Sequence, residues 1–105
     1  MTELRIVIAD AEARHRKYPR TFQIPPRALR RGLQPGHFAK LVFEPSPNPE
    51  ETGERMWVEV TEIRGAGRYR GRLDSRPATW PFTAAHRAGD RIDFGAEHVI
   101  DVMVR

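Results

Sequence analysis

The chain lacks cysteine altogether. This absence excludes disulfide bonds and thiolate metal sites, and it is consistent with the cytoplasmic location that we expect. Long apolar runs are also missing, since the longest spans only a few residues against the roughly 20 that a membrane-spanning helix requires. The first residues, MTELRIVIADAEARH, have no basic stretch followed by a long apolar one, so we expect no secretory signal and no membrane contact.

The chain has 105 residues, of which 39% are hydrophobic and 30% charged, a composition typical of one globular domain. Its charge is uneven: residues 1–45 contain nine Lys or Arg against four Asp or Glu, whereas residues 46–105 contain nine against ten. A basic excess permits contact with nucleic acid or with acidic partners. The alternative, which we favour, is that the arginines are solvated or paired with the abundant carboxylates.

The stretch ERMWVEVTEIRGAGRYRGRLD, residues 54–74, predicts two strands joined by a glycine turn at Gly65-Ala66-Gly67. Hydrophobic residues alternate along both strands, so one face is expected in the core. That face consists of Met56, Val58, Val60, Tyr69 and Leu73. The second strand places Arg68, Arg70 and Arg72 together on the opposite face.

The rest of the chain predicts further short elements. Strands are expected over 4–8, 37–44, 91–94 and 98–105, helices over 9–17 and 27–32, an extended segment over 21–24, a loop over 45–53 and a connecting segment over 74–88. We expect Asp10 to cap the first helix, and Phe22, Ile24, Trp80 and Phe82 to lie in the core. The predicted fold is α+β: a small curved antiparallel sheet or SH3-like barrel with one or two short N-terminal helices. The whole chain, 1–105, is expected to form a single domain, with 1–17 as a strand and helix extension and 18–105 as the core.

A series of short motifs runs along the chain: Tyr18-Pro19-x-Thr21-Phe22-x-Ile24-Pro25, Leu33-x-Pro35-Gly36-x-x-x-Lys40-Leu41-x-Phe43, Glu54-x-Met56-Trp57-Val58-x-Val60, Gly71-x-Leu73 and Gly89-Asp90-x-Ile92-x-Phe94-x-x-x-His98-Val99-Ile100-Asp101. Together they resemble a bacterial domain family of unknown function, the YegJ-like family, over roughly residues 18–103. The chain departs from that pattern at His37, at Asp74–Pro77 and at Val102. The motifs consist of glycine turns and core aromatics, so the resemblance implies a fold and no chemistry. A weaker resemblance, to immunity proteins of bacterial toxin systems, implies a protein partner.

No motif for catalysis or for a cofactor is present. The sequence has no nucleophile elbow, no phosphate-binding glycine loop and no dinucleotide fingerprint. The histidines His15, His37, His86 and His98 lack the spacing of a helical metal site. His98, beside Glu97, is the best candidate ligand, and a structural hydrogen bond is the preferred interpretation. We therefore expect a protein that is not an enzyme and that has no catalytic residue, metal or cofactor.

The candidate binding surface is basic. The row Arg68, Arg70 and Arg72 could meet successive phosphates, with Trp57, Tyr18 or Phe38 as stacking surfaces. The alternative, which we favour, is that the row pairs with carboxylates on neighbouring strands, such as Glu59 and the neighbours of Glu62, or is simply a solvated face. A second cluster, Arg27, Arg30 and Arg31, lies on the short predicted helix.

The sequence therefore predicts a non-enzymatic bacterial binding or interaction module. An unknown protein partner, of the immunity kind in one version, is the preferred hypothesis. The alternative is a small β-barrel that binds nucleic acid through the arginine row. A third hypothesis is a barrel that binds a small molecule. The sequence makes no prediction of the oligomeric state.

Overall fold

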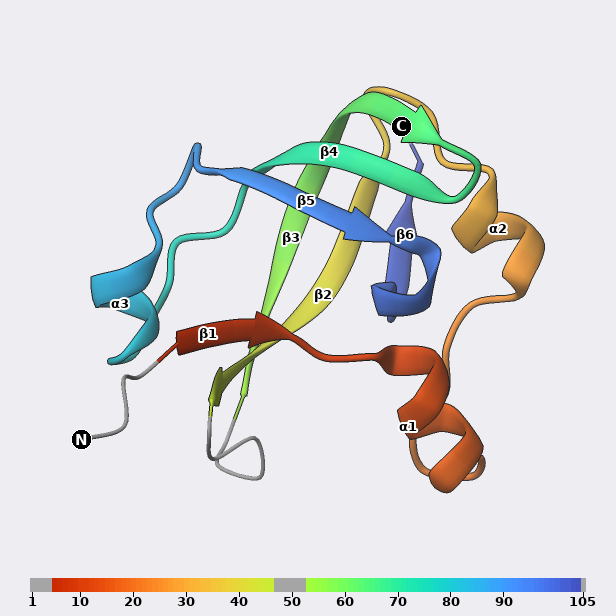
Figure 1. The fold of residues 1–105 in the computed structure, drawn as a ribbon, viewed down its shortest axis with the longest axis horizontal. Helices are drawn as coiled ribbons and strands as arrows, with labels where there is room; N and C mark the ends of the chain where they lie inside the picture. Colours follow the sequence, from red (N-terminus) through yellow and green to blue (C-terminus); the bar gives the residue numbers. More distant parts are fainter. Residues whose placement is uncertain (1–4, 47–52, 105) are drawn as a thin grey trace.

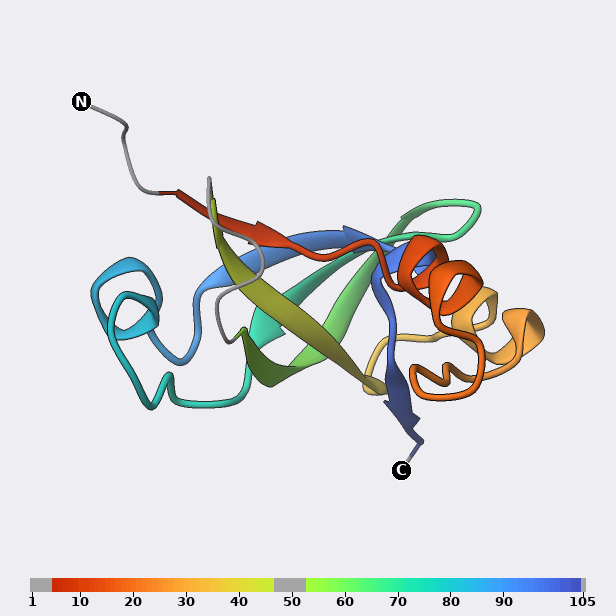
Figure 2. The ribbon, with the colours of Figure 1, turned by 90° about the horizontal axis from the view of Figure 1, so that it is seen from below.

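The computed structural model describes residues 5–46 and 53–104, so most of the loop predicted over 45–53 lies outside the described residues. In chain order the elements are β1 (Arg5–Ile8), α1 (Ala11–Lys17), α2 (Arg27–Arg31), β2 (Phe38–Ser46), β3 (Glu54–Gly65), β4 (Arg68–Leu73), α3 (Phe82–Ala85), β5 (Arg91–Gly95), the 3-10 helix η1 (Ala96–His98) and β6 (Asp101–Met103). The sheet curls into a nearly closed barrel, with α1 and α2 at one end and α3 at the other (Figure 1). Figure 2 shows the same separation of the helices from below.

The sheet is antiparallel throughout and runs in the order β1-β2-β3-β4-β5. One edge of β2 pairs with β3, and β1 and β6 share its other edge. Strand β1 pairs with residues 43–46 of β2, whereas β6 pairs with residues 38–40. The meander β2 to β5, followed by a 3-10 helix and a strand that returns to β2, matches the predicted SH3-like arrangement, and the α+β fold class is confirmed.

The core forms where the alternation of residues predicted it. All five side chains expected there are 2% exposed or less: Met56, Val58, Val60, Tyr69 and Leu73. They pack with Leu41, Phe43 and Phe94 in one cluster that fills the inside of the barrel. The rings of Tyr69 and Phe94 lie 5.3 Å apart between centroids. Neither hollow described below is lined by a buried member of this cluster, so the small-molecule hypothesis draws no support from the barrel interior.

One glycine lets the sheet bend sharply. Gly71 lies opposite Val60, next to a register shift in the pairing of β3 with β4. A Cβ at Gly71 would lie 2.5 Å from the Glu59 carbonyl oxygen, closer than two such atoms approach. The absence of a side chain at this position therefore permits the close approach of β3 and β4.

The two N-terminal helices are present as predicted, although α1 begins at Ala11, two residues later than expected, and α2 ends at Arg31, one residue earlier. The Asp10 side chain accepts a hydrogen bond of 2.9 Å from the Ala13 amide, which caps α1, and Gly32 follows the last turn of α2. Strand β2 is buried on both faces along most of its length. Arg14 pairs with the buried Glu44 at 2.6 Å and lies 5.5 Å from the centroid of the Phe22 ring.

Three of the four aromatic and aliphatic residues expected in the core outside the hairpin lie elsewhere. Phe22 and Ile24 are only half-buried, because their segment passes outside the sheet and is no part of it. Phe82 is buried as expected, at 2% exposure, but Trp80 is 73% exposed. The connecting segment contains the short helix α3, which places Phe82 in the core and leaves Trp80, just before the helix, in solvent. The prediction that Trp80 lies in the core was therefore wrong. No helix among the described residues is long and apolar enough to span a membrane.

Candidate binding surfaces

The three arginines of the predicted row lie on the outer face of β4, flanked by carboxylates on both neighbouring strands. Across β3, Arg72 lies opposite Glu59 and Arg70 opposite Glu62. Across β5, Arg70 lies opposite Asp93. The strand registers therefore bring opposite charges together, which is the alternative that the sequence left open.

Arg70 has the closest set of acidic neighbours. Its Nε donates to Asp93 Oδ1 at 2.9 Å, and its Nη1 lies 3.8 Å from Glu62 Oε2. The hydrogen bond from Arg70 holds the pKa of Asp93 below its usual value. The same bond raises the pKa of Arg70. Both groups are exposed to water, so we assign this pair no more than the small stabilisation of a surface ion pair.

The other two arginines of the row are also paired. Arg68 Nη1 donates to Glu97 Oε1 at 2.7 Å, and Arg72 Nη2 donates to Glu59 Oε1 at 3.3 Å. Each positive charge of the row thus has a carboxylate within ion-pair distance. A phosphate chain approaching this face would meet the carboxylates as well as the guanidinium groups, so the row is a weak polyanion site.

The second predicted cluster is divided by the fold. Arg27 and Arg31 are exposed, but Arg30 is 6% exposed and cannot belong to a surface for a partner. Its guanidinium pairs with Glu12 of α1 and donates to the carbonyl oxygens of Pro25, at 2.8 Å, and Ala96, at 3.0 Å. Arg30 is therefore a structural residue that joins α2 to α1 and η1.

The aromatic residues proposed as stacking surfaces are also dispersed. Trp57 is half-buried on β3, and the Lys40 ammonium lies 5.4 Å from the centroid of its ring. Phe38 is 6% exposed, so it offers no face for stacking. Tyr18 is 49% exposed, and it follows α1 with Lys17 lying 5.3 Å from the centroid of its ring.

Each histidine has a structural contact. His15 and His37 make hydrogen bonds to backbone groups through Nδ1. The rings of His86 and Phe43 pack in a T-shaped arrangement with their centroids 5.4 Å apart. His98 Nδ1 accepts a hydrogen bond of 3.0 Å from the Gly95 amide, which fixes the neutral ring with its proton on Nε2. Burial lowers the pKa of His98, opposed by the charge of Glu97 and aided by that of Arg68. Within residues 5–46 and 53–104, no group of three or more His, Asp or Glu could hold a metal ion.

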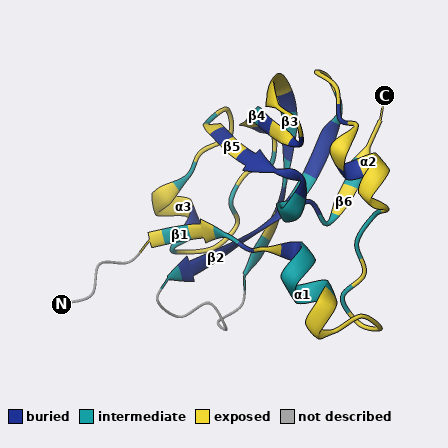
Figure 3. Ribbon diagram, turned by 45° about the vertical axis from the view of Figure 1, so that its right-hand side comes forward, coloured by how far each residue is buried: buried dark blue, intermediate teal, exposed yellow. Residues whose placement is uncertain are grey.

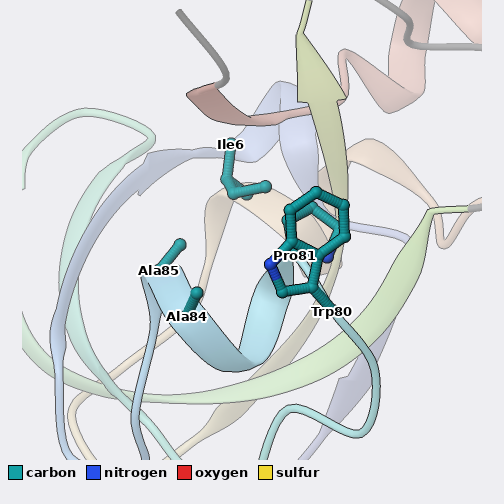
Figure 4. Close-up of a pocket in the computed structure, with 5 residues that line it drawn as sticks. All are labelled: Ile6, Trp80, Pro81, Ala84 and Ala85. Atoms are coloured by element: carbon teal, nitrogen blue, oxygen red, sulfur yellow. The ribbon is translucent and has the colours of Figure 1, made fainter.

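An apolar hollow beside α3 was not predicted from the sequence. It has a volume of about 250 Å³ and is lined by Ile6, Trp80, Pro81, Ala84 and Ala85. Figure 4 shows Ile6 of β1 directed toward α3, with the indole of Trp80 on one side and the two alanines on the other. Nothing local in the sequence joins Ile6 to Trp80, because their proximity depends on where β1 pairs with β2. We call these five residues the Trp80 hollow.

A second, smaller hollow of about 170 Å³ lies where the segment after α1 passes over the sheet. It is lined by Thr21, Phe22, Gln23, Arg55 and Ile100. Its surroundings are polar, and no cluster of titratable groups faces it among the lining residues. We assign it no function.

Comparison with known proteins gives no further guide: no family model, no curated protein and no solved structure matches the chain significantly. What the chain does must therefore be argued from its own surfaces. They are a paired arginine face, an apolar hollow at one end of the barrel and the helical end opposite.

Proposed function

We propose that this protein is a non-enzymatic binding module that docks a protein partner on the Trp80 hollow. The observation that supports the proposal is a tryptophan that is 73% exposed beside an apolar depression. Tryptophan is the residue type most often found to dominate binding energy at protein interfaces, and exposed apolar depressions mark such interfaces. The partner is a protein that inserts an apolar or aromatic side chain between Trp80 and Ile6.

The hollow rests on rigid supports. Ile6 packs against the central core from β1, and Phe82, buried to 2% exposure, anchors α3. A surface held in this way loses little conformational entropy when a partner binds. At about 250 Å³ the hollow is open and smaller than most sites for drug-sized molecules, which favours one or two inserted side chains over a small-molecule ligand.

Arginines that are close in sequence to the residues of the Trp80 hollow indicate which charges a partner should carry around its apolar contact. Arg5 precedes Ile6, and Arg76 and Arg87 flank the segment that contains α3; all three are exposed. No ion pair joins any of them to another described residue. A partner with an apolar centre and an acidic rim is the best complement. The weaker resemblance to immunity proteins would make that partner a toxin.

A photo-crosslinking amino acid at Ala84 tests the proposal in cells. Ala84 lines the hollow and is exposed, so a partner seated there should be captured in a specific, mass-identified adduct. The matched control carries the crosslinker at Leu29, which is 52% exposed at the opposite end of the molecule. With the purified partner, Trp80→Ala should weaken binding by roughly 30-fold, and Leu29→Ala by less than about threefold. Equal capture from both positions, or equal affinities of the two alanine variants, would contradict the proposal.

A further inference from the structure

The basic residues of the chain separate into two groups according to whether a carboxylate is near them. From Ala13 to Phe43 the sequence contains no Asp or Glu, while the same interval contains eight Lys or Arg. Three of these eight are buried or half-buried: Arg14, which pairs with Glu44, Arg30, which pairs with Glu12, and Lys40, which lies over Trp57. The remaining five are Arg16, Lys17, Arg20, Arg27 and Arg31, and all five are exposed.

No ion pair involves any of the five among the residues that the structure describes. The arginines of β4 differ, because each of them has a carboxylate neighbour. The formal charges of the five therefore add without local compensation. We call Arg16, Lys17, Arg20, Arg27 and Arg31 the basic end.

The fold brings these five residues to one end of the molecule. Arg16 and Lys17 end α1, Arg20 follows it, and Arg27 and Arg31 lie on α2. Figures 1 and 2 place α1 and α2 together at the end opposite α3, and in Figure 3 the C-terminal end of α1 and most of α2 are coloured as exposed. The buried contacts of Arg30 with Glu12 and Ala96 hold the two helices in this arrangement.

We propose that the basic end binds the phosphates of a nucleic acid backbone. Four of the five residues are arginines, whose planar guanidinium groups bind phosphate oxygens in pairs. Tyr18, 49% exposed within the same segment, offers a ring on which an unpaired base can stack.

The composition of this end argues against an acidic protein as the ligand. Protein interfaces depend on an apolar centre. The large hydrophobic residues exposed on α1, α2 and the described chain between them are only Tyr18 and Leu29. Both helices are also short, of seven and five residues, so neither extends far along a major groove. The basic end should therefore bind nucleic acid through its charge and without preference for a base sequence. The affinity should depend strongly on the salt concentration.

Two variants of equal charge test the proposal. The basic-end variant carries Arg16→Ala, Lys17→Ala, Arg20→Ala, Arg27→Ala and Arg31→Ala. The matched control carries Arg5→Ala, Arg55→Ala, Arg76→Ala, Arg87→Ala and Arg91→Ala, all exposed and outside the basic end. Each variant loses five positive charges, so each has a formal net charge of −1 in place of +4. If the basic-end variant does not fold, the triple variant Arg16→Gln, Lys17→Gln, Arg20→Gln replaces it.

The measurement is fluorescence anisotropy with labelled oligonucleotides of about 16 nucleotides, single-stranded and duplex. For five phosphate contacts, the logarithm of the affinity of the wild type should fall against the logarithm of salt with a slope of about −3.5 for the single strand and −4.5 for the duplex. The affinity should thus fall at least about 100-fold between 50 and 200 mM salt. The basic-end variant should lose binding, whereas the control and Trp80→Ala should keep it.

Several outcomes would overturn the inference. Absence of binding by the wild type at 50 mM salt would do so, and so would equal losses in the two charge-matched variants, because the effect would then follow net charge alone. Displacement of the oligonucleotide by polyglutamate at the same charge concentration would assign the basic end to an acidic protein. Failure of the Trp80 experiment leaves this proposal standing, since the two surfaces lie at opposite ends of the molecule.

Discussion

Arg30 and Glu12, eighteen residues apart in the sequence, form an ion pair that joins α2 to α1. The same guanidinium also reaches the Ala96 carbonyl of η1, at 3.0 Å. One buried side chain thus connects two helices to the last turn before β6. The basic end depends on this connection, because α1 and α2 carry four of its five cations.

Replacement of Arg30 should be costly. In Arg30→Met the carbonyl oxygen of Pro25 loses the Arg30 donor, that of Ala96 keeps only the longer bond from the Val99 amide, and Glu12 loses its partner. We expect a loss of about 3 kcal/mol in the free energy of unfolding, measured by urea denaturation. The matched control is Arg27→Met on the same helix, which is exposed and should change the free energy by less than about 0.5 kcal/mol. Similar values for the two variants would show that Arg30 does not fasten the helices.

The two tyrosines of the chain provide a second comparison. The Tyr69 hydroxyl donates to the Arg30 carbonyl at 2.8 Å and accepts from the Leu33 amide at 3.3 Å, inside the core. Tyr69→Phe leaves both backbone groups without that partner, so we expect a loss of about 1–2 kcal/mol. Tyr18→Phe, at an exposed ring, should be nearly neutral. Thermal and urea unfolding of both variants would check this, and a neutral Tyr69→Phe would contradict it.

The stability should fall as the pH falls below neutrality, because of His98. Burial lowers the pKa of His98 in the folded protein, whereas in the unfolded chain this histidine titrates near its usual value of about 6.5. Between these two pKa values the unfolded state binds more protons, so stability rises with pH across that window and is lost as the pH decreases through it. The bond from the Gly95 amide to His98 Nδ1 requires the neutral ring.

His98→Asn keeps an acceptor for the Gly95 amide but cannot titrate. The difference in unfolding free energy between the wild type and this variant should therefore depend on pH as the pH falls through the usual histidine pKa of about 6.5, with the wild type losing more on acidification. Urea unfolding at a series of pH values gives both curves. Parallel curves would exclude His98 as the source of the pH dependence.

Alanine substitutions at Gly71 and Gly36 compare the cost of steric crowding with the cost of backbone strain. A Cβ at Gly71 would lie 2.5 Å from the Glu59 carbonyl oxygen, so Gly71→Ala must push β3 and β4 apart, at a cost of about 3 kcal/mol. Gly36 has open space around it but a φ of 94°, so Gly36→Ala should cost only about 1 kcal/mol. Unfolding of the two variants side by side would test this order, and the reverse order would show that the sheet accommodates a methyl group at Gly71.

Alternation along the chain was sufficient to predict the core of the barrel. Met56, Val58 and Val60 are buried because every second residue of a strand faces the same side, which is a local property. The cap at Asp10 and the end of α2 at Gly32 are local as well. The pairing of β3 with β4 across the Gly65-Ala66-Gly67 turn is also local, whereas the pairing of β1 and β6 with β2 joins distant parts of the chain.

Which side chains lie at the surface was harder to predict, because this depends on contacts between residues that are far apart in the sequence. Trp80 and Phe82 are both large and aromatic, and only the position of the short helix α3 decides that Phe82 enters the core. Arg30 is buried and Arg27 is exposed on one helix because Glu12 and Ala96 lie on one side of it. The partners of the arginine row, Asp93 and Glu97, become visible only when the register of β5 is known.

The edge of β2 that pairs with both β1 and β6 has a consequence for local unfolding of the protein. Strands β3, β4 and β5 each pair with a neighbour in sequence, whereas β6 is three residues long and pairs with a strand about sixty residues earlier. Detaching β6 breaks few contacts and leaves the pairing of β2 to β5 intact, so partial opening should begin there and not in the meander. In native-state hydrogen exchange the amides of residues 101–103 should exchange earlier than those of β4, and equal protection would show that the barrel opens as one unit.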